Sequence, residues 1–382
     1  MTKKDYIVFI LFLALFLGGC LRSYGPEDVY KIAVVAPLSG TDAALGESIV
    51  HGAELAVSEV NKEGGIDQKN IVLIKEDDGG LVGEGAFFAY RLTRTAMILG
   101  VIGHLDSDIS IPASEFYAKA KIPEISPGTT SPYFTEREAT RGYVFRTIGR
   151  DDTQGRMAAD YVVKNGFKRV VILYHDRVYG RSLSGEFAKT VKTAKVPNKP
   201  AIVYYNKIEA GKTDFGALLS HLSSLKPDII FLAGEYNDAG YLVKDFPKYG
   251  LEKTQFIGGD GVYHTDFIKI GGINTESSIV ISAPPIIDKS FIERYKEHYK
   301  HNPTGYSANT YDATNILIDA IRKVKEKNPE EIAKVVASTV NFMGVTGEIT
   351  FDKNGDLTSE GFVLNKVEKG RFKVIENNGK KV

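Results

Sequence analysis

The chain has 382 residues, 43% of them hydrophobic, which is ample for two compact domains because single cores stop growing near about 250 to 300 residues. Basic and acidic residues balance at 48 each, without a clustered basic run, and this excludes nucleic acid as the main partner. The single cysteine, Cys20, lies at the expected cleavage site of the N-terminal segment, and we expect no free thiol after cleavage. Disulfides and cysteine-based metal or redox chemistry are therefore excluded from the mature chain.

The first 20 residues have the layout of an export signal. Lys3 and Lys4 precede an apolar run over residues 6–17, and two glycines follow it. As a helix, this run of about 12 residues spans roughly 18 Å, whereas a bilayer core needs about 20 residues. We therefore predict a signal peptide over residues 1–20 rather than a membrane-spanning anchor. An ordinary secretory signal and an uncleaved anchor remain alternatives.

The end of this segment, Leu17-Gly18-Gly19-Cys20, resembles the lipobox of bacterial-type lipoproteins. The resemblance implies that cleavage makes Cys20 the new N-terminus and that its sulfur carries lipid. The polar residues 21–29 would then form a tether. The protein is accordingly expected on the outer face of the cytoplasmic membrane, on its periplasmic or extracellular side.

From residue 31 onward, short β-rich runs alternate with amphipathic helical stretches, which is typical of parallel sheets covered by helices. The first unit is predicted to have strands over 32–36, 71–76, 97–103 and 122–126, and helices over 49–61, 85–95 and 108–121. The second is predicted to have helices over 152–165, 180–194, 214–225 and 237–249, and strands over 169–174, 201–205, 229–233 and 255–258. A helix over 309–325 and strands over 349–351 and 362–375 follow. Two lobes of related α/β architecture are the expected result.

Seven short motifs occur in order along this pattern. They are residues 36–40 (APLSG), 60–66 (VNKEGGI), 101–107 (VIGHLDS), 125–130 (ISPGTT), 152–155 (DTQG), 174–180 (YHDRVYG) and 259–262 (GDGV). Each motif alone is weak, but their common order and spacing are specific. From residue 31 to about 362 the chain resembles the branched-chain amino acid (Leu/Ile/Val) binding proteins, the amino-acid branch of the type I periplasmic-binding fold.

This resemblance implies two Rossmann-like α/β lobes joined by three crossover strands, near residues 146–150, 278–283 and 345–349. The N-terminal lobe would comprise 30–147 plus 283–344, and the C-terminal lobe 148–282 plus 345–382. It also implies a monomeric substrate-binding lipoprotein of an ABC importer. The expected partners are a small amino acid, the transmembrane subunits of a permease and, through the lipid anchor, the membrane.

A free α-amino acid is a zwitterion, so its site needs donors for a carboxylate and an acceptor for an ammonium. Ser107 follows an apolar strand and starts a helix, whose positive N-terminus favours an anion. Thr129 and Thr130 lie in the next strand-to-helix loop, where Gly128 allows close backbone approach. The alternative is that Ser107 or Asp108 simply caps the helix. The resemblance implies that Ser107 and Thr130 hold the ligand backbone.

For the ammonium, Asp260 follows a predicted strand and resembles the family's acidic acceptor, with Gly261 next to it. Branched-chain binders usually have Glu there, so Asp shortens the reach by about one methylene. A bare Gly-Asp-Gly sequence is more often a turn. Tyr179 and the pair Glu235-Tyr236 match positions where the family's second lobe presents aromatic groups across the cleft, although a lone Tyr usually serves packing.

Three positions bear on selectivity. Leu45 stands where some branched-chain binders place a large aromatic residue, which would enlarge the pocket or alter its lid. Asp106 and Asp108 flank Ser107, and two carboxylates beside an anion site are unfavourable unless they face solvent or balance a cationic ligand. We expect a branched-chain or other aliphatic amino acid, with the ligand class better determined than its identity.

The motifs of common enzymes are missing from the sequence, which has no G-x-G-x-x-G after the first strand, no P-loop, no G-x-S-x-G and no H-E-x-x-H. We therefore expect neither an enzyme nor a cofactor or metal. His298 and His301, on a charged helix, are interpreted as surface groups. A ligand sensor of the same fold remains an alternative, as does an amide, urea or aromatic acid as ligand.

Overall fold

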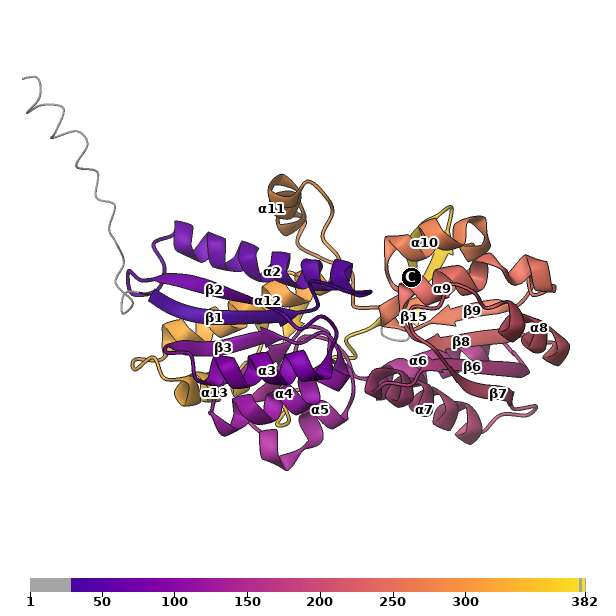
Figure 1. Cartoon of the computed structure of the whole chain (residues 1–382), viewed down its shortest axis with the longest axis horizontal. Helices are drawn as coiled ribbons and strands as arrows, with labels where there is room; N and C mark the ends of the chain where they lie inside the picture. Colours follow the sequence, from indigo (N-terminus) through magenta and orange to yellow (C-terminus); the bar gives the residue numbers. More distant parts are fainter. Residues whose placement is uncertain (1–28, 378–379, 382) are drawn as a thin grey trace, which may run out of the picture.

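The computed structural model describes residues 29–377 and 380–381, which form two α/β lobes placed side by side (Figure 1). The predicted signal peptide, Cys20 and the tether up to residue 28 lie outside the described residues. Within the described ranges, no helix is both long enough and apolar enough to cross a membrane.

The first lobe is built on a five-stranded parallel sheet in the order β2-β1-β3-β4-β5. Its strands are β1 (Val29–Ala36), β2 (Asn70–Asp77), β3 (Ile98–Gly103), β4 (Glu124–Ser126) and β5 (Val144–Arg146). Every residue of β3 is buried, as expected for a parallel strand covered on both faces. The predicted strands of this unit therefore form one sheet, each within a few residues of its predicted bounds.

Helices cover both faces of this sheet (Figure 1). They are α2 (Ala43–Lys62), α3 (Val82–Thr93), α4 (Ser107–Lys119) and α5 (Tyr133–Glu136) with the 3-10 turn η1 (Glu138–Thr140), and, from later in the chain, α12 (Gly305–Lys323) and α13 (Pro329–Ala337). The helix α11 (Lys289–Tyr299) packs on α2 and α12 instead of on the sheet. Side chains alternate along β1, so Ile32 and Val34 join the core under α2 and α12, while Ala33 and Val35 join a second core under α3 and α4. The two cores hold the sheet between two helical layers.

The helices α2 and α12 approach closely at Gly52. A Cβ at this position would collide with the carbonyl group of Ser307, so only glycine permits the contact. A helix near the C-terminus is thereby fixed to the first lobe, which makes this lobe discontinuous in sequence.

The second lobe contains an eight-stranded mixed sheet in the order β15-β14-β13-β10-β9-β8-β6-β7. Its strands are β6 (Arg169–His175), β7 (Ala201–Ile208), β8 (Ile229–Ala233), β9 (Gln255–Gly258), β10 (Ile279–Ser282), β13 (Val363–Glu368), β14 (Arg371–Asn377) and β15 (Lys380–Lys381). Strands β6 to β10 are parallel, whereas β13 to β15 add antiparallel pairs. The expected fold class, parallel sheets flanked by helices, is confirmed, with this antiparallel edge as an addition.

The helices of the second lobe are α6 (Asp151–Lys164), α7 (Val178–Thr193), α8 (Gly216–Leu225), α9 (Tyr236–Lys244) and α10 (Thr265–Gly271), with 3-10 turns η2 (Phe246–Tyr249), η3 (Asp260–Val262) and η4 (Gly272–Thr275). The predicted helix over 237–249 is split, because α9 ends at Lys244 and a proline follows in η2. Proline lacks the N–H that would continue an α-helix.

The chain passes between the two sheets three times: after β5, after β10, and between the small hairpin β11 (Phe342–Gly344) and β12 (Gly347–Ile349) and strand β13. Residues 351–357 still lie against the first sheet, since the N–H of Arg146 donates to the carbonyl oxygen of Gly355 at 3.0 Å. We propose that the last lobe boundary falls between residues 357 and 363, later than the boundary at 345 expected from the sequence.

Arg146, the last residue of β5, is completely buried where the first crossing begins. Its Nε pairs with Oδ1 of Asp356 at 2.7 Å, and its terminal nitrogens donate to the carbonyl oxygens of Thr129 and Ser131 at 2.7 and 2.9 Å. This guanidinium therefore joins the crossing segments to the loop that follows β4.

Candidate functional site

A small cavity lies between the lobes, with about 280 Å³ not filled by protein atoms. It is located beyond the carboxyl ends of the strands, where ligands of open α/β sheets bind. The residues that line it are Leu45, Leu105, Asp106, Ser107, Gly128, Tyr179, Glu235, Asp260, Gly261 and Tyr306. Seven of the ten predicted ligand-binding residues are in this set, whereas Thr129, Thr130 and Tyr236 are not.

The first-lobe wall is formed by the N-terminus of α4. Ser107 begins the helix, and its Oγ accepts a hydrogen bond from the N–H of Ser131 at 3.3 Å. The first N–H groups of a helix have no partner within it and favour a negative group. This end of α4 is therefore suited to a carboxylate, and the ligand contact of Ser107 stays a prediction.

The loop after β4 approaches the same place through Gly128. A Cβ there would lie 2.7 Å from Cδ1 of Leu105, so a side chain would force the two loops apart. The Thr129 hydroxyl shares a short hydrogen bond with the Ser110 hydroxyl, and Thr130 is fully buried, its carbonyl accepting the N–H of Asp151 at 2.9 Å. Both threonines thus stand behind the cavity wall, and their predicted ligand contact remains a prediction.

Asp260 forms the opposite wall, at the start of η3 after β9, and is 4% exposed. Its Oδ1 accepts from Gln154 Nε2 at 2.8 Å and from the Tyr179 hydroxyl at 2.9 Å, and its Oδ2 accepts from the Tyr306 hydroxyl at 3.1 Å. Burial raises the pKa of the Asp260 carboxyl, and these hydrogen bonds oppose the rise. The carboxylate is thus held in one orientation inside the cleft.

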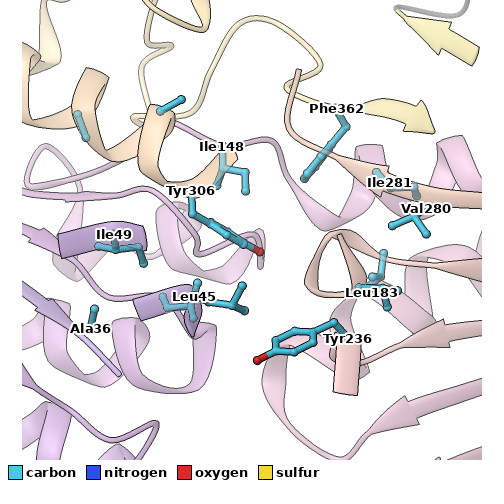
Figure 2. Close-up of a cluster of buried hydrophobic side chains, with 14 of the residues drawn as sticks. Ala36, Leu45, Ile49, Ile148, Leu183, Tyr236, Val280, Ile281, Tyr306 and Phe362 are labelled. Atoms are coloured by element: carbon cyan, nitrogen blue, oxygen red, sulfur yellow. The ribbon is translucent and has the colours of Figure 1, made fainter. Parts of the chain in front are cut away.

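Tyr306 was missed by the sequence analysis. It lies at the start of α12 and bonds to Asp260 of the other lobe. Figure 2 shows its ring extending from α12 toward the second lobe. The signal was available, since Thr304 and Ser307 form a capping box that starts α12 at Gly305. The predicted helix began only at residue 309, so Tyr306 fell outside it.

Leu45 and Tyr236 face one another across the cleft in Figure 2, from α2 and from the start of α9. Leu45 is buried and lines the cavity. The Tyr236 hydroxyl lies 3.4 Å from the carbonyl oxygen of Thr41, and its ring packs on His264 with 4.3 Å between centroids. Tyr236 therefore contributes to the contact between lobes beside the cavity.

The two aspartates that flank Ser107 have different surroundings. Asp108 extends to the second lobe, where both its carboxylate oxygens accept the N–H of Val178 at 2.8 and 2.9 Å, at the N-terminus of α7. Asp106 instead lines the cavity together with Glu235. The alternative interpretation was that Ser107 or Asp108 caps the helix that Ser107 begins. Asp108 does act as a cap, but for α7 of the other lobe.

Residues 29–371, nearly all of the described chain, match the family described as periplasmic binding proteins. The chain belongs to this family. A Leu/Ile/Val-binding protein homologue from Brucella abortus is 32% identical over 343 residues, covering 89% of this chain and 90% of that protein. Among solved structures, the leucine-binding protein LivK from Thermotoga maritima has 29% identity and a TM-score of 0.81, covering 91% of this chain and 97% of the other.

A second structure, the branched-chain amino acid transporter substrate-binding protein LivJ from Streptococcus pneumoniae in complex with isoleucine, has 28% identity and a TM-score of 0.82, over 91% of this chain and 99% of the other. This member of the periplasmic binding protein family is therefore of the ABC transporter type and homologous to Leu/Ile/Val binders. Its homologues are solute-binding proteins of transporters, not enzymes. Across the part of the chain that the structure describes, no cluster of His, Cys, Asp or Glu could hold a metal ion.

Proposed function

We propose that this periplasmic binding protein binds a free α-amino acid in the cavity between its lobes and delivers it to an ABC permease. One arrangement supports this above all: an oriented, buried carboxylate in one lobe faces a helix N-terminus in the other. Asp260 would accept the ligand ammonium, while Ser107 and the first N–H groups of α4 would hold its carboxylate, with Gly128 leaving room beside them. The two opposite charges of a zwitterion match these two walls.

Closure of the two lobes would complete the site. Two hydrogen bonds join the lobes here: the Val178 N–H donates to Asp108, and the Tyr306 hydroxyl donates to Asp260. Tyr306 and Asp260 line the cavity. An open form would lack them and admit the ligand, whereas the closed form would present both lobe surfaces to a permease. The three crossings supply the hinge about which the lobes would rotate.

A ligand panel tests the proposal. We expect at least one of the twenty amino acids to raise the melting temperature of the purified mature protein and to give a measurable Kd by calorimetry. Asp260→Asn would weaken that binding by about 2–5 kcal/mol, roughly 30-fold or more, because an ammonium would lose its charged acceptor. Asp266→Asn is the matched control, since Asp266 pairs with Lys269 outside the cavity. The proposal is wrong if no amino acid binds, or if both variants bind equally well.

Membrane attachment through Cys20 belongs to this proposal as well. The twin-glycine sequence before Cys20 supports it. In cells that export the protein, Cys20→Ser is expected to move it from the membrane fraction to the soluble extracytoplasmic fraction. Retention of the variant in the membrane would point to an uncleaved signal anchor instead.

A sensor role of the same fold is separated from import by one comparison. Deletion of the protein should abolish uptake of the ligand that the panel identifies. Intact uptake together with a lost transcriptional or chemotactic response would favour the sensor. The homology to transporter components supports import.

A further inference from the structure

Acidic side chains gather at the cavity from both lobes, beyond what a zwitterion requires. Asp106 precedes α4 in the first lobe, and Glu235 precedes α9 in the second, and both line the cavity. Asp42, which precedes α2, lies near Asp106. A Cβ placed on Gly80 would lie 3.8 Å from Oδ2 of Asp42 and 3.9 Å from Oδ2 of Asp106. Asp106, Glu235 and Asp260 thus line the cavity, and Asp42 lies beside Asp106.

These acids do not serve as helix caps, which is the usual reason for an acid before a helix. In none of the three helices does the preceding carboxylate accept a hydrogen bond from a first-turn N–H of the helix. Oδ2 of Asp106 and Oδ1 of Asp42 are buried without a hydrogen-bond partner among the described residues, and Asp42 is only 5% exposed. Glu235 lies against Gly261, where a Cβ would collide with its carboxylate. Buried acceptors without partners are costly, so these groups call for a donor.

Positive charge from the protein is scarce at this place. No Lys or Arg is among the residues given above as lining the cavity. Arg177, before α7, acts on Asp42 and Asp106 from a distance, but in the described part of the chain it forms no ion pair with either. His175 also faces Asp42, although it pairs with Asp238 at 2.9 Å. Arg177 therefore acts on two of these four carboxylates, Asp42 and Asp106.

Burial first, and the neighbouring carboxylates in addition, raise the pKa values of these acids. Burial raises the pKa of Asp106 to about 8, with Asp42, Asp78 and Asp108 adding to the rise and Arg177 opposing it. Burial likewise raises the pKa of Glu235 well above its usual value, with Asp42, Asp106 and Asp260 adding to the rise. A cation placed between these carboxylates would relieve the repulsion.

An aliphatic ligand side chain would make the situation worse. It would remove water from Asp106 and Glu235 and return no hydrogen bond. A ligand side chain that ends in a cation would donate to both, while Leu45 and Tyr306 provide apolar surface for its methylenes.

We propose that Asp106 and Glu235 form a cation subsite and that the ligand is an amino acid with a positively charged side chain, such as arginine, lysine or ornithine. The inference rests on the proposed function, because the α-ammonium is assigned to Asp260. The α-carboxylate then remains at the N-terminus of α4. A planar guanidinium offers donors to two carboxylates at once, which favours arginine within this class.

Calorimetry with matched ligands tests this subsite. Arginine and its neutral analogue citrulline have similar shapes, and lysine and norleucine form a second pair. We expect the charged member of each pair to bind at least about tenfold more tightly, because only a cation can form charge-assisted hydrogen bonds with the ionised forms of Asp106 and Glu235. Leucine, isoleucine and valine are measured beside them.

Three variants locate the effect. Asp106→Asn and Glu235→Gln should each reduce the preference for arginine over citrulline by about tenfold or more. Glu252→Gln changes the net charge equally at an exposed site outside the cavity and should leave the preference unchanged. Melting temperatures of all variants show whether each one folds.

The outcomes separate the two proposals. Leucine, isoleucine or valine binding as tightly as arginine would overturn the cation subsite and leave the amino-acid function intact. Binding of the diamine putrescine or of agmatine but of no amino acid, with loss in Glu235→Gln, would overturn the amino-acid function and support the subsite. If neither amino acids nor these cations bind, both proposals are wrong.

Discussion

The buried guanidinium of Arg146 offers a direct test of how the crossing segments support the site. We expect Arg146→Met to lower the free energy of unfolding by about 3–5 kcal/mol, because removal of one partner from a buried charged network leaves the others unsatisfied. Methionine keeps an unbranched apolar stem, so packing is largely preserved and the lost interactions dominate.

The structure gives the basis for this magnitude. Arg146 donates to Thr129, Ser131 and the Thr135 hydroxyl at 2.7 to 2.9 Å, and each acceptor is buried. Each buried acceptor that loses its charged donor lowers the free energy of unfolding by about 1–3 kcal/mol. Asp356 is partly protected, since Arg150 also pairs with it at 2.7 Å, which keeps the total below the simple sum.

Urea unfolding followed by circular dichroism measures the loss. Arg150→Met is the control, because the Arg150 side chain is 20% exposed and we expect a loss of only about 1 kcal/mol. Since Arg146 also fixes the loop at Thr129, ligand affinity should fall in Arg146→Met at temperatures where the variant is folded. A loss below about 1 kcal/mol, or equal losses in both variants, would refute this account of the crossing.

Three further predictions concern the cavity. The Asp106 carboxyl, with its pKa raised to about 8, is mostly protonated at pH 7, so binding of arginine should release protons and should tighten as the pH rises toward 8. Calorimetry in buffers of different ionisation enthalpy measures the proton release. Binding without proton release would contradict this prediction. Because of the same raised pKa, the folded state binds more protons than the unfolded state, so the ligand-free protein should lose stability from pH 5 to pH 8. Urea titrations measure this stability, and a rise over the same pH range would count against the prediction. Asp108→Asn should weaken ligand binding about fivefold, because the substitution weakens the cap on the N–H of Val178, which favours the closed form. Small-angle scattering should then show more of the open form. An unchanged Kd would mean that this contact does not contribute to closure.

Much of the fold could be predicted because each element carries its own signal. The continuous apolar runs of β3 and β8 and the glycines after α2 mark their elements locally, and the predicted strand over 229–233 matches β8. The element bounds that failed depend on capping or packing. The start of α12 is set by the Thr304 capping box, and the position of residues 351–357 is set by contacts with β5 that are distant in sequence.

The candidate site shows the same division. Ser107, Asp260 and Gly128 could be predicted because they lie at strand ends within recognisable motifs, where a parallel sheet gathers its ligand groups. Thr129 and Thr130 lie in the same motif but do not line the cavity, where the Thr129 hydroxyl bonds to Ser110 and the Thr130 carbonyl accepts the N–H of Asp151. The convergence of the acids that precede three helices could not be predicted, since Asp42 and Asp106 meet only through the packing of the first lobe, and Glu235 joins them only when the two lobes meet.

The joining of α12 to α2 also governs how the chain can mature. Because α12 is synthesised after the parallel strands of the second lobe, the apolar face of α2 stays uncovered while most of the protein is being made. Such a delay leaves the first lobe incomplete until α12 has been made. It also means that a premature stop codon after β10 would remove α12 from the first lobe and β13 and β14 from the second, so both lobes would be left incomplete.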